Sequence, residues 1–163
     1  DHARALAHYA RERFDLSADV CATPAQAVAG ASIVCTTTAS PTPVLEGAWL
    51  SAGTHVNAVG ACIPTTRELD TALVRQARLY VDRRESALNE AGDYLIAAKE
   101  GVVGPENIVA EIGELLLGTK SGRASATEIT LFKSLGLAIE DVASAEYLYR
   151  KAQKQNAGTW VDF

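Results

Sequence analysis

The sequence predicts an α/β fold, in which a parallel, doubly wound sheet is flanked by helices. Short apolar runs rich in β-branched residues alternate along the chain with stretches of helical length, which is the pattern of βαβ units. The run from Val20 to Thr66 contains a single formal charge, Glu46. Such a segment arises where strands are buried on both faces or where loops lie against a ligand. At 163 residues, the chain is long enough to bury a core.

The first half of the chain supplies two strands and two helices. A helix is expected at 1–14, with Asp1 as its cap and Leu6, Ala10 and Phe14 on its apolar side. Thr23 followed by Pro24 predicts a second helix start. Strands are expected at 32–36 and 54–59, the second ended by a glycine. Two prolines make 38–44 irregular.

The second half continues the alternation. A helix over 68–77 places Leu69, Leu73 and Ala77 on one face. Residues 79–81 and 128–132 are strand-like, and Ile108 and Ile112 belong to the apolar stripe of a helix over 106–117. Further helices are expected at 85–89, 92–100 and 138–153.

The composition excludes several classes of protein. Hydrophobic residues at 48% and charged residues at 21% exclude a disordered chain. A net charge of −5 without a basic tract argues against nucleic-acid binding. The sequence has no apolar stretch of about 18 residues, so no membrane span is expected. Three cysteines, an odd number, predict reduced thiols and a cytoplasmic protein.

The sequence contains no methionine and opens on a helix pattern with no strand before it. We therefore expect the chain to be the C-terminal part of a larger protein. No G-x-G-x-x-G motif follows a strand, so the glycine-rich turn of a dinucleotide site would lie upstream.

Two strand ends are candidates for a ligand site. Thr36, Thr37 and Thr38 follow the first strand, and Gly60 follows the second. Ligands of open parallel sheets bind beyond the carboxyl ends of the strands, where small residues let a ligand approach backbone N–H groups. The alternative is that threonine simply favours strands and glycine ends them.

Other residues are weaker candidates. Cys62 lies on the second strand-end loop and suits proton transfer, although a lone cysteine is also a common small apolar residue. Ser134 either caps the helix that follows or reaches a ligand. Glu90 and Asp93 flank a turn, and we expect both to be solvated, as we do the Arg83-Arg84 pair. The three histidines and three cysteines lack metal-ligand spacing, so no metal site is expected.

Five segments resemble, in order and spacing, the C-terminal half of the ornithine cyclodeaminase/mu-crystallin family. They are AVAGASIVCTTTASPTPVL, HVNAVGACIPTTREL, LYVDRRESALNEAGD, IGELLLG and TLFKSLGLAIEDVASA. The resemblance implies a Rossmann-type sheet that here lacks its first strand and glycine-rich turn. It implies a partial nucleotide-binding domain over 1–127, and a strand and helix over 128–163 that return to a second, substrate and dimerisation domain.

The resemblance also implies a function. Family members use NAD or NADP to transfer hydride at a carbon that bears nitrogen, on a small imine or amino-acid substrate, and the full-length protein is expected to be a homodimer. Matching positions assign cofactor contacts to Thr38, Ala39, Val59, Gly60, Ala61 and Ser134, and substrate contacts to Glu90 and Leu135. The position of Cys62 is that of the proton-transfer residue.

The chain departs from ornithine cyclodeaminases at two positions. Those enzymes carry an aspartate where Cys62 stands and a lysine where Thr66 stands, whereas mu-crystallins resemble this chain more closely. We therefore expect an imine reductase or amino-acid dehydrogenase rather than an ornithine cyclodeaminase. One alternative is a non-catalytic, NADP-dependent protein that binds a small ligand, as mu-crystallins bind thyroid hormone. Another is that the isolated chain binds no nucleotide.

Overall fold

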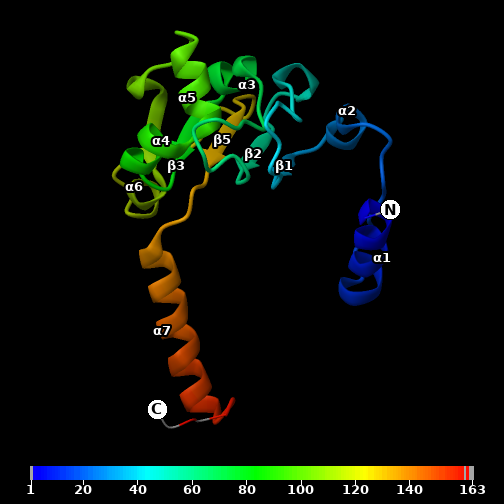
Figure 1. The fold of residues 1–163 in the computed structure, drawn as a ribbon, viewed down its shortest axis with the longest axis vertical. Helices are drawn as coiled ribbons and strands as arrows, with labels where there is room; N and C mark the ends of the chain where they lie inside the picture. The colour runs from blue at the N-terminus through cyan, green and yellow to red at the C-terminus, as the bar shows by residue number, and fades with distance from the viewer. Residues whose placement is uncertain (1, 160, 162–163) are drawn as a thin grey trace.

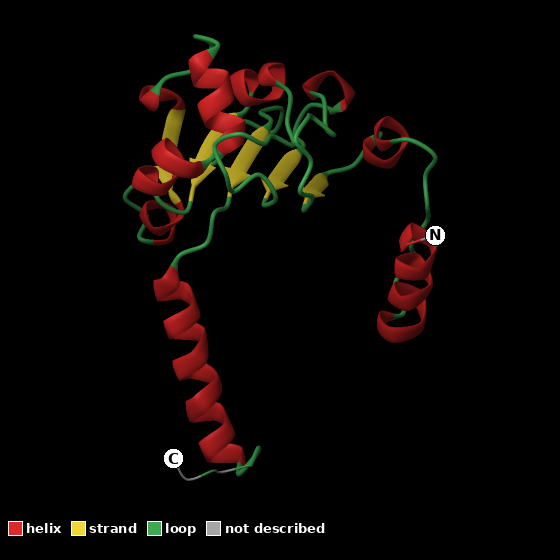
Figure 2. Cartoon of the chain, in the orientation of Figure 1, coloured by secondary structure: helices red, strands yellow, loops and turns green. Residues whose placement is uncertain are grey.

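A five-stranded parallel sheet forms the centre of the protein (Figures 1 and 2). The computed structural model describes residues 2–159 and 161. Across the sheet the strands run β1 (Ile33–Thr36), β2 (His55–Ala58), β5 (Thr130–Lys133), β3 (Arg78–Val81) and β4 (Ile108–Glu111). The helices are α1 (His2–Phe14), α2 (Pro24–Val28), α3 (Thr71–Gln76), α4 (Arg84–Glu90), α5 (Gly92–Lys99), α6 (Ile112–Leu116) and α7 (Ala138–Gln155). The predicted α/β class, a parallel sheet with flanking helices, is confirmed.

One face of the sheet carries the hydrophobic core. Val34, Val56, Leu131 and Leu79 are register neighbours across β1, β2, β5 and β3, and all are buried. They pack in one cluster with apolar residues of α3 and α5, among them Leu73, Val74, Tyr94 and Ala97. These helices lie together over this side of the sheet in Figure 2. The near absence of charge from Val20 to Thr66 reflects burial only in part. Residues of β1 alternate between buried and exposed and those of β2 between buried and half-buried, so the expected burial of these strands on both faces is not found.

Polar side chains cap the first turns of α2 and α3. Thr23 caps α2 by accepting a hydrogen bond from the N–H of Gln26 at 3.3 Å, as the Thr-Pro pair predicts. Asp70 caps α3 by accepting from the N–H of Leu73 at 2.9 Å. That cap moves the helix start to Thr71. Leu69, predicted to lie on the helix, instead precedes it and forms a parallel bridge with Leu45.

The predicted helix over 106–117 is wrong in its first half. Residues Pro105–Asn107 form a 3-10 turn, Ile108–Glu111 form β4, and only Ile112–Leu116 are α-helical. Strand β4 pairs with β3, and the guanidinium of Arg84 donates to the carbonyls of Ile108 at 2.7 Å and Val109 at 3.1 Å. Tertiary pairing thus overrides the helical spacing. Arg84, expected to be solvated, is half-buried because of the same contacts.

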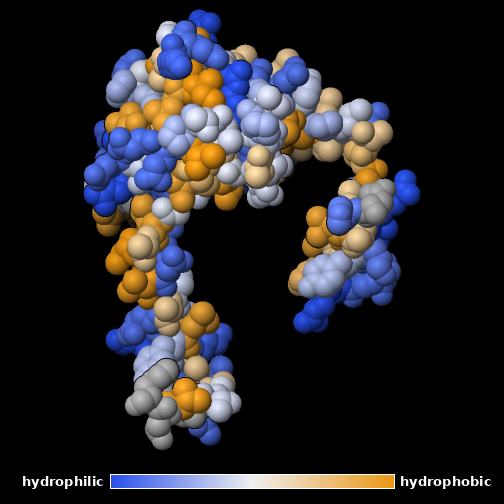
Figure 3. All heavy atoms as spheres, in the orientation of Figure 1, coloured by the Kyte–Doolittle hydropathy of each residue, from blue (hydrophilic) through white to orange (hydrophobic). Residues whose placement is uncertain are grey.

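Helices α1 and α7 stand apart from the sheet, and both lie below it in the view of Figure 1, α7 at the left and α1 at the right. Both expose large apolar side chains, and Figure 3 shows hydrophobic atoms along each. The exposed residues include Leu6 and Phe14 on α1 and Ile139, Val142 and Leu148 on α7. The predicted cap of α1, Asp1, lies outside the described residues. The division of the chain at residue 127 and the return of α7 to a second domain stay predictions.

Candidate functional site

The carboxyl ends of β1, β2 and β5 lie side by side. Thr36, Ala58 and Lys133 are register partners at the last positions of these strands. Backbone hydrogen bonds continue the pairing into the loops, from Val59 N–H to the Thr36 carbonyl at 2.9 Å and from Ser134 N–H to the Ala58 carbonyl at 3.0 Å. The loops 37–40, 59–62 and 134–137 therefore form one edge of the sheet, which is where parallel sheets bind ligands.

Thr38 and Gly60 lie in direct contact at this edge. A Cβ atom on Gly60 would lie 2.0 Å from the Thr38 carbonyl oxygen, so only glycine fits there. The side chain of Thr38 is exposed and Gly60 is partly exposed. The predicted proximity of these two residues is confirmed, and neither is sealed beneath packed side chains.

A buried carboxylate links the two loops. Glu68 is 0% exposed, and its Oε2 accepts hydrogen bonds from the Thr36 hydroxyl and the Gly60 N–H, both at 2.8 Å. Its Oε1 accepts from the N–H of Thr38. Because N–H and O–H donors replace water around this carboxylate, its burial does not leave a polar group unpaired.

A second buried carboxylate supports the first. Asp93 Oδ1 accepts from the N–H groups of Glu68 at 2.8 Å and Leu69 at 2.9 Å, and Oδ2 lies 3.5 Å from the Lys133 ammonium. Burial raises the pKa of Asp93, while the Leu69 N–H and the Lys133 charge oppose that rise. Asp93 was expected to be solvated. It is 2% exposed because the first turn of α5, on which it lies, packs against Glu68, Leu69 and Lys133.

The loop after β5 is held by Asp82, which is 4% exposed. Asp82 Oδ2 accepts from the N–H groups of Leu135 at 2.5 Å and Gly136 at 2.7 Å. Ser134 does not cap the following helix, since α7 begins at Ala138 with Leu137 as its cap residue. Ser134 is therefore placed on the strand-end loop, half-buried beside the loop of β2.

Cys62 lies where the loops of β2 and β5 meet. Its thiol donates to the Val59 carbonyl at 3.0 Å and lies 4.0 Å from the Ser134 carbonyl. The side chain is exposed. The thiol is therefore accessible at the junction of the two loops.

The remaining predicted site residues differ in accessibility. Ala39 and Val59 are exposed on the first two loops, whereas Ala61 is 1% exposed, so the structure leaves neither its side chain nor its backbone open to a ligand. Leu135 is half-buried. Glu90 is exposed at the end of α4, two residues before Gly92, which packs against the Ile63 and Thr66 carbonyls. Glu90 thus lies near the loop that follows Cys62.

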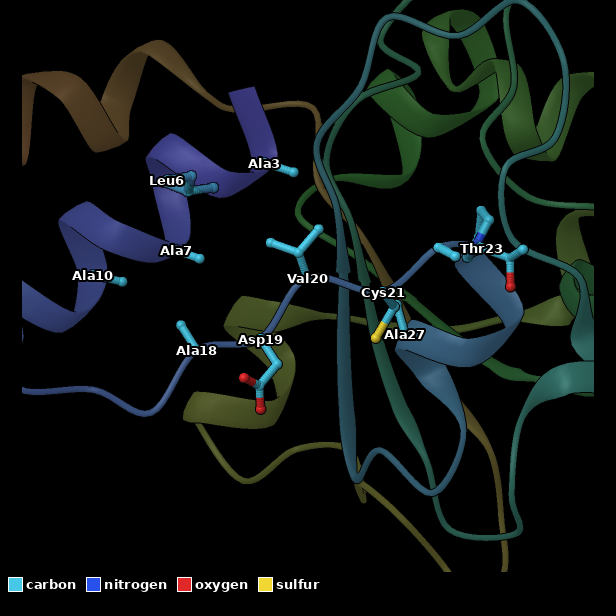
Figure 4. A pocket seen from close by; sticks show the side chains of 12 residues that line it. Ala3, Leu6, Ala7, Ala10, Ala18, Asp19, Val20, Cys21, Thr23 and Ala27 are labelled. Atoms are coloured by element: carbon cyan, nitrogen blue, oxygen red, sulfur yellow. The ribbon is translucent and has the colours of Figure 1, made fainter. Parts of the chain in front are cut away.

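Two cavities differ in chemical character. One of about 670 Å³ lies between α1 and the segment leading into α2. Figure 4 shows it lined by small apolar side chains such as Ala7, Ala10 and Val20. A cavity of about 260 Å³ lies at the end of β1, where Thr36, Thr37 and Thr38 contribute hydroxyl groups. The smaller cavity is the better candidate because it adjoins the loop at the carboxyl end of β1.

The described part of the chain, 2–159 and 161, contains no group of three or more His, Cys, Asp or Glu residues that could hold a metal ion. In the same residues, no helix is long and apolar enough to cross a membrane.

Sequence reasoning missed Glu68, Asp82, Asp93 and Lys133 as members of this edge. Asp82 and Lys133 carried a usable signal, because each is a charged residue directly at the end of an apolar strand run. Glu68 carried none. It lies between Arg67 and Asp70 at the start of the expected helix over 68–77, where charged residues are usually solvated.

Comparison with known proteins identifies relatives over nearly the whole chain. Residues 1–156 match the model of the ornithine cyclodeaminase/mu-crystallin family. The chain is 41% identical over its full length to a Δ1-pyrroline-2-carboxylate reductase of Bacillus cereus, of which it covers 50%. It is 45% identical over 130 residues (80% of this chain, 39% of that protein) to the ketimine reductase mu-crystallin of Mus musculus.

A solved structure has the same fold. The Δ1-pyrroline-2-carboxylate reductase of Thermococcus litoralis, in complex with NADH and L-proline, superposes with a TM-score of 0.92 at 39% identity, over 97% of this chain and 49% of that one. The chain thus spans about half the length of the relatives it matches.

Proposed function

Because the chain belongs to the ornithine cyclodeaminase/mu-crystallin family, we propose that the protein containing it is a nicotinamide-dependent oxidoreductase acting on an imine or an α-amino acid. In the reducing direction, hydride adds to the imine carbon and the nitrogen takes a proton, which gives the amine. The proposal rests on the contact between Thr38 and Gly60. These two residues form an accessible surface beyond the carboxyl ends of β1 and β2.

The N–H groups of Thr38 and Gly60 donate to Glu68, so they are not available to a phosphate of the dinucleotide. The carboxylate nearest to this surface, Glu68, is buried and saturated with donors, so no acidic side chain projects toward a bound phosphate from this point. The cofactor-binding residues of the proposal are Thr38, Ala39, Val59, Gly60, Ala61 and Ser134. Ala61 is the buried member of this set. When bound, the nicotinamide supplies or receives the hydride.

We assign proton transfer to Cys62, and substrate contacts to Leu135 and Glu90. The Cys62 thiol lies between the Val59 and Ser134 carbonyls. A thiol provides no fixed negative charge beside a substrate amine unless its pKa is lowered. This chemistry favours reduction of an imine that is already formed over the cyclodeamination of ornithine.

The expected cofactor is NAD(H), since NADH occupies the Thermococcus litoralis reductase; NADP(H) remains the second nucleotide to be assayed. We further propose that the complete protein is a homodimer located in the cytoplasm. The exposed apolar side chains of α7, such as Ile139 and Leu148, supply surface that a second chain or domain would cover. Sedimentation of the complete gene product tests the dimer.

Activity is tested with the complete gene product, Δ1-pyrroline-2-carboxylate and NADH or NADPH. Loss of the reduced-nicotinamide absorbance together with the appearance of proline supports the proposal. Saturable nucleotide binding without turnover of any cyclic imine would instead identify the protein as a small-ligand binder. Steady formation of proline from ornithine would contradict the assignment to imine reduction.

A further inference from the structure

Glu68 differs from the other charged residues at the strand ends in its surroundings. It is completely buried, yet within residues 2–159 and 161 no Lys or Arg side chain forms an ion pair with it. Its three partners are two backbone N–H groups and one hydroxyl. A carboxylate buried without a cation is stabilised only by such oriented donors.

The two N–H groups belong to different strand-end loops. Thr38 N–H binds Oε1 and Gly60 N–H binds Oε2. At the carboxyl ends of β1 and β2, the last backbone hydrogen bond between them runs from the Val59 N–H to the Thr36 carbonyl. Beyond that bond, the Glu68 carboxylate provides the hydrogen-bond link between the loops. It occupies the space beside Gly60, where a Cβ would lie 2.4 Å from Oε1.

The backbone of Glu68 is itself fixed on both sides. Its N–H donates to Asp93 Oδ1 at 2.8 Å, and its carbonyl accepts from the N–H groups of Val44 at 2.7 Å and Leu45 at 3.0 Å. Asp93 in turn pairs with Lys133 on β5. The carboxylate is therefore presented to the two loops from a rigid support, as preorganisation of a binding site requires.

We propose that Glu68 is a positioning residue that holds the loops after β1 and β2 in the conformation that receives the dinucleotide. The inference rests on the proposed function. Glu68 acts through the Thr38 and Gly60 backbone and touches neither cofactor nor substrate. Its removal is therefore expected to weaken cofactor binding and to spare the hydride-transfer step.

The substitution E68Q tests whether Glu68 acts through its hydrogen bonds or only through the volume of its side chain. All three partners of Glu68 donate hydrogen bonds in this arrangement, and a glutamine offers one acceptor oxygen and one donor NH2. In either orientation of the amide, the NH2 faces one of the two backbone N–H groups. The Thr36 hydroxyl adapts by rotating, but the backbone groups do not. One loop therefore loses its attachment while the volume of the side chain is kept.

The experiment combines two measurements on the complete gene product. Amide hydrogen exchange of Thr38 and Gly60 is measured without nucleotide, and the Kd for NADH is measured by fluorescence titration. For E68Q we expect one of the two amides to exchange at least about tenfold faster and the Kd to rise at least about tenfold, the value of one hydrogen bond. At saturating NADH, kcat is expected to stay within about twofold of the original.

The matched control is T54V. It removes a buried hydroxyl hydrogen bond to the Ala31 carbonyl at the opposite end of β2 and leaves every contact of Glu68 in place. Hydrogen exchange at the Thr38 and Gly60 amides and the Kd for NADH are therefore expected to remain unchanged. The variant E68D, which keeps the charge but is shorter by one methylene, serves where E68Q fails to fold. It cannot span both loops and should show the same two effects at smaller size.

The outcomes distinguish the two proposals. If the unaltered protein binds neither NADH nor NADPH, the proposed function is wrong, and the cofactor role of Glu68 is wrong with it. If the unaltered protein binds NADH and the folded variants bind it equally well, only the inference about Glu68 is wrong. A lower melting temperature with unchanged Kd and unchanged exchange at Thr38 and Gly60 likewise overturns it.

Discussion

The ammonium group of Lys133 lies 3.5 Å from the Asp93 carboxylate, and the two side chains are 1% and 2% exposed. Lys133 also donates to the carbonyl of Ala58 at 3.2 Å. Asp93 Oδ2 accepts no hydrogen bond from the described residues, so the ion pair is its main compensation. Because Asp93 also accepts a hydrogen bond from the Glu68 N–H, this ion pair connects the central strand β5 to the backbone of Glu68.

Removing one partner of this pair is expected to destabilise the fold strongly. K133M leaves a carboxylate buried without its counter-ion, which costs about 3 kcal/mol of unfolding free energy. D93N removes the opposite charge and is also destabilising. Because the residues interact directly, the double variant should lose at least about 1 kcal/mol less than the sum of the single losses. Urea denaturation measures all three, and strict additivity would show that the pair contributes nothing.

Gly60 is required by the close approach of Thr38. In G60A, the new Cβ would meet the Thr38 carbonyl oxygen at 2.0 Å and the Glu68 carboxyl at 2.4 Å. Separation of these groups is expected to cost about 2–3 kcal/mol and to abolish nucleotide binding. The control is G113A on α6, where a Cβ meets nothing within 4 Å. G113A should bind nucleotide normally. If G60A and G113A bind nucleotide equally well, the close approach of Thr38 to Gly60 is not required for binding.

Cys62 is expected to affect turnover rather than cofactor affinity. If its thiol transfers the proton, C62A lowers kcat by about a hundredfold or more and leaves the Kd for NADH unchanged. C62S keeps a donor and should retain part of the rate. Cys21 provides the control, because it is an exposed thiol before α2 that does not line the cavity at the end of β1. Full activity of C62A would exclude the thiol as the proton donor.

The pKa of Glu100 is held below its usual value of 4.5, first by the hydrogen bond from the Thr71 hydroxyl and also by Arg67. A carboxyl group whose pKa is lower in the folded than in the unfolded state stabilises the fold at pH values above its unfolded-state pKa. That stabilisation is lost as the pH falls through the folded-state pKa. T71V is expected to return the Glu100 pKa toward 4.5. An NMR titration of the Glu100 side chain checks this.

T119V is the comparison for the Glu100 titration. The Thr119 hydroxyl donates to the Glu114 carbonyl and not to Glu100. Its loss should leave the Glu100 titration unchanged. If T71V leaves it unchanged as well, the Thr71 hydrogen bond does not lower the pKa.

Local patterns predicted the elements whose cause is local. Thr23 and Pro24 begin α2 because a hydroxyl and a missing N–H act within one turn of the chain. The apolar runs of β1 and β2 are strands because β-branched residues fit a buried sheet. The helix spacing failed at Ile108, because pairing with β3 decided the conformation there. Periodicity alone does not distinguish such a short apolar run from a helix.

By itself, the sequence determined the parallel α/β class and the small residues that follow β1 and β2, since both are visible in local patterns of the chain. Tertiary pairing decided that β5 lies between β2 and β3, which brings the loop of Ser134 beside the end of β2. Only the tertiary structure decided that Glu68 and Asp93 are buried and that Lys133 pairs with Asp93. Glu68 binds Thr38 from 30 residues away. The ionisation state and burial of a charged side chain depend on the partners that the fold brings to it, and local composition carries no information about them.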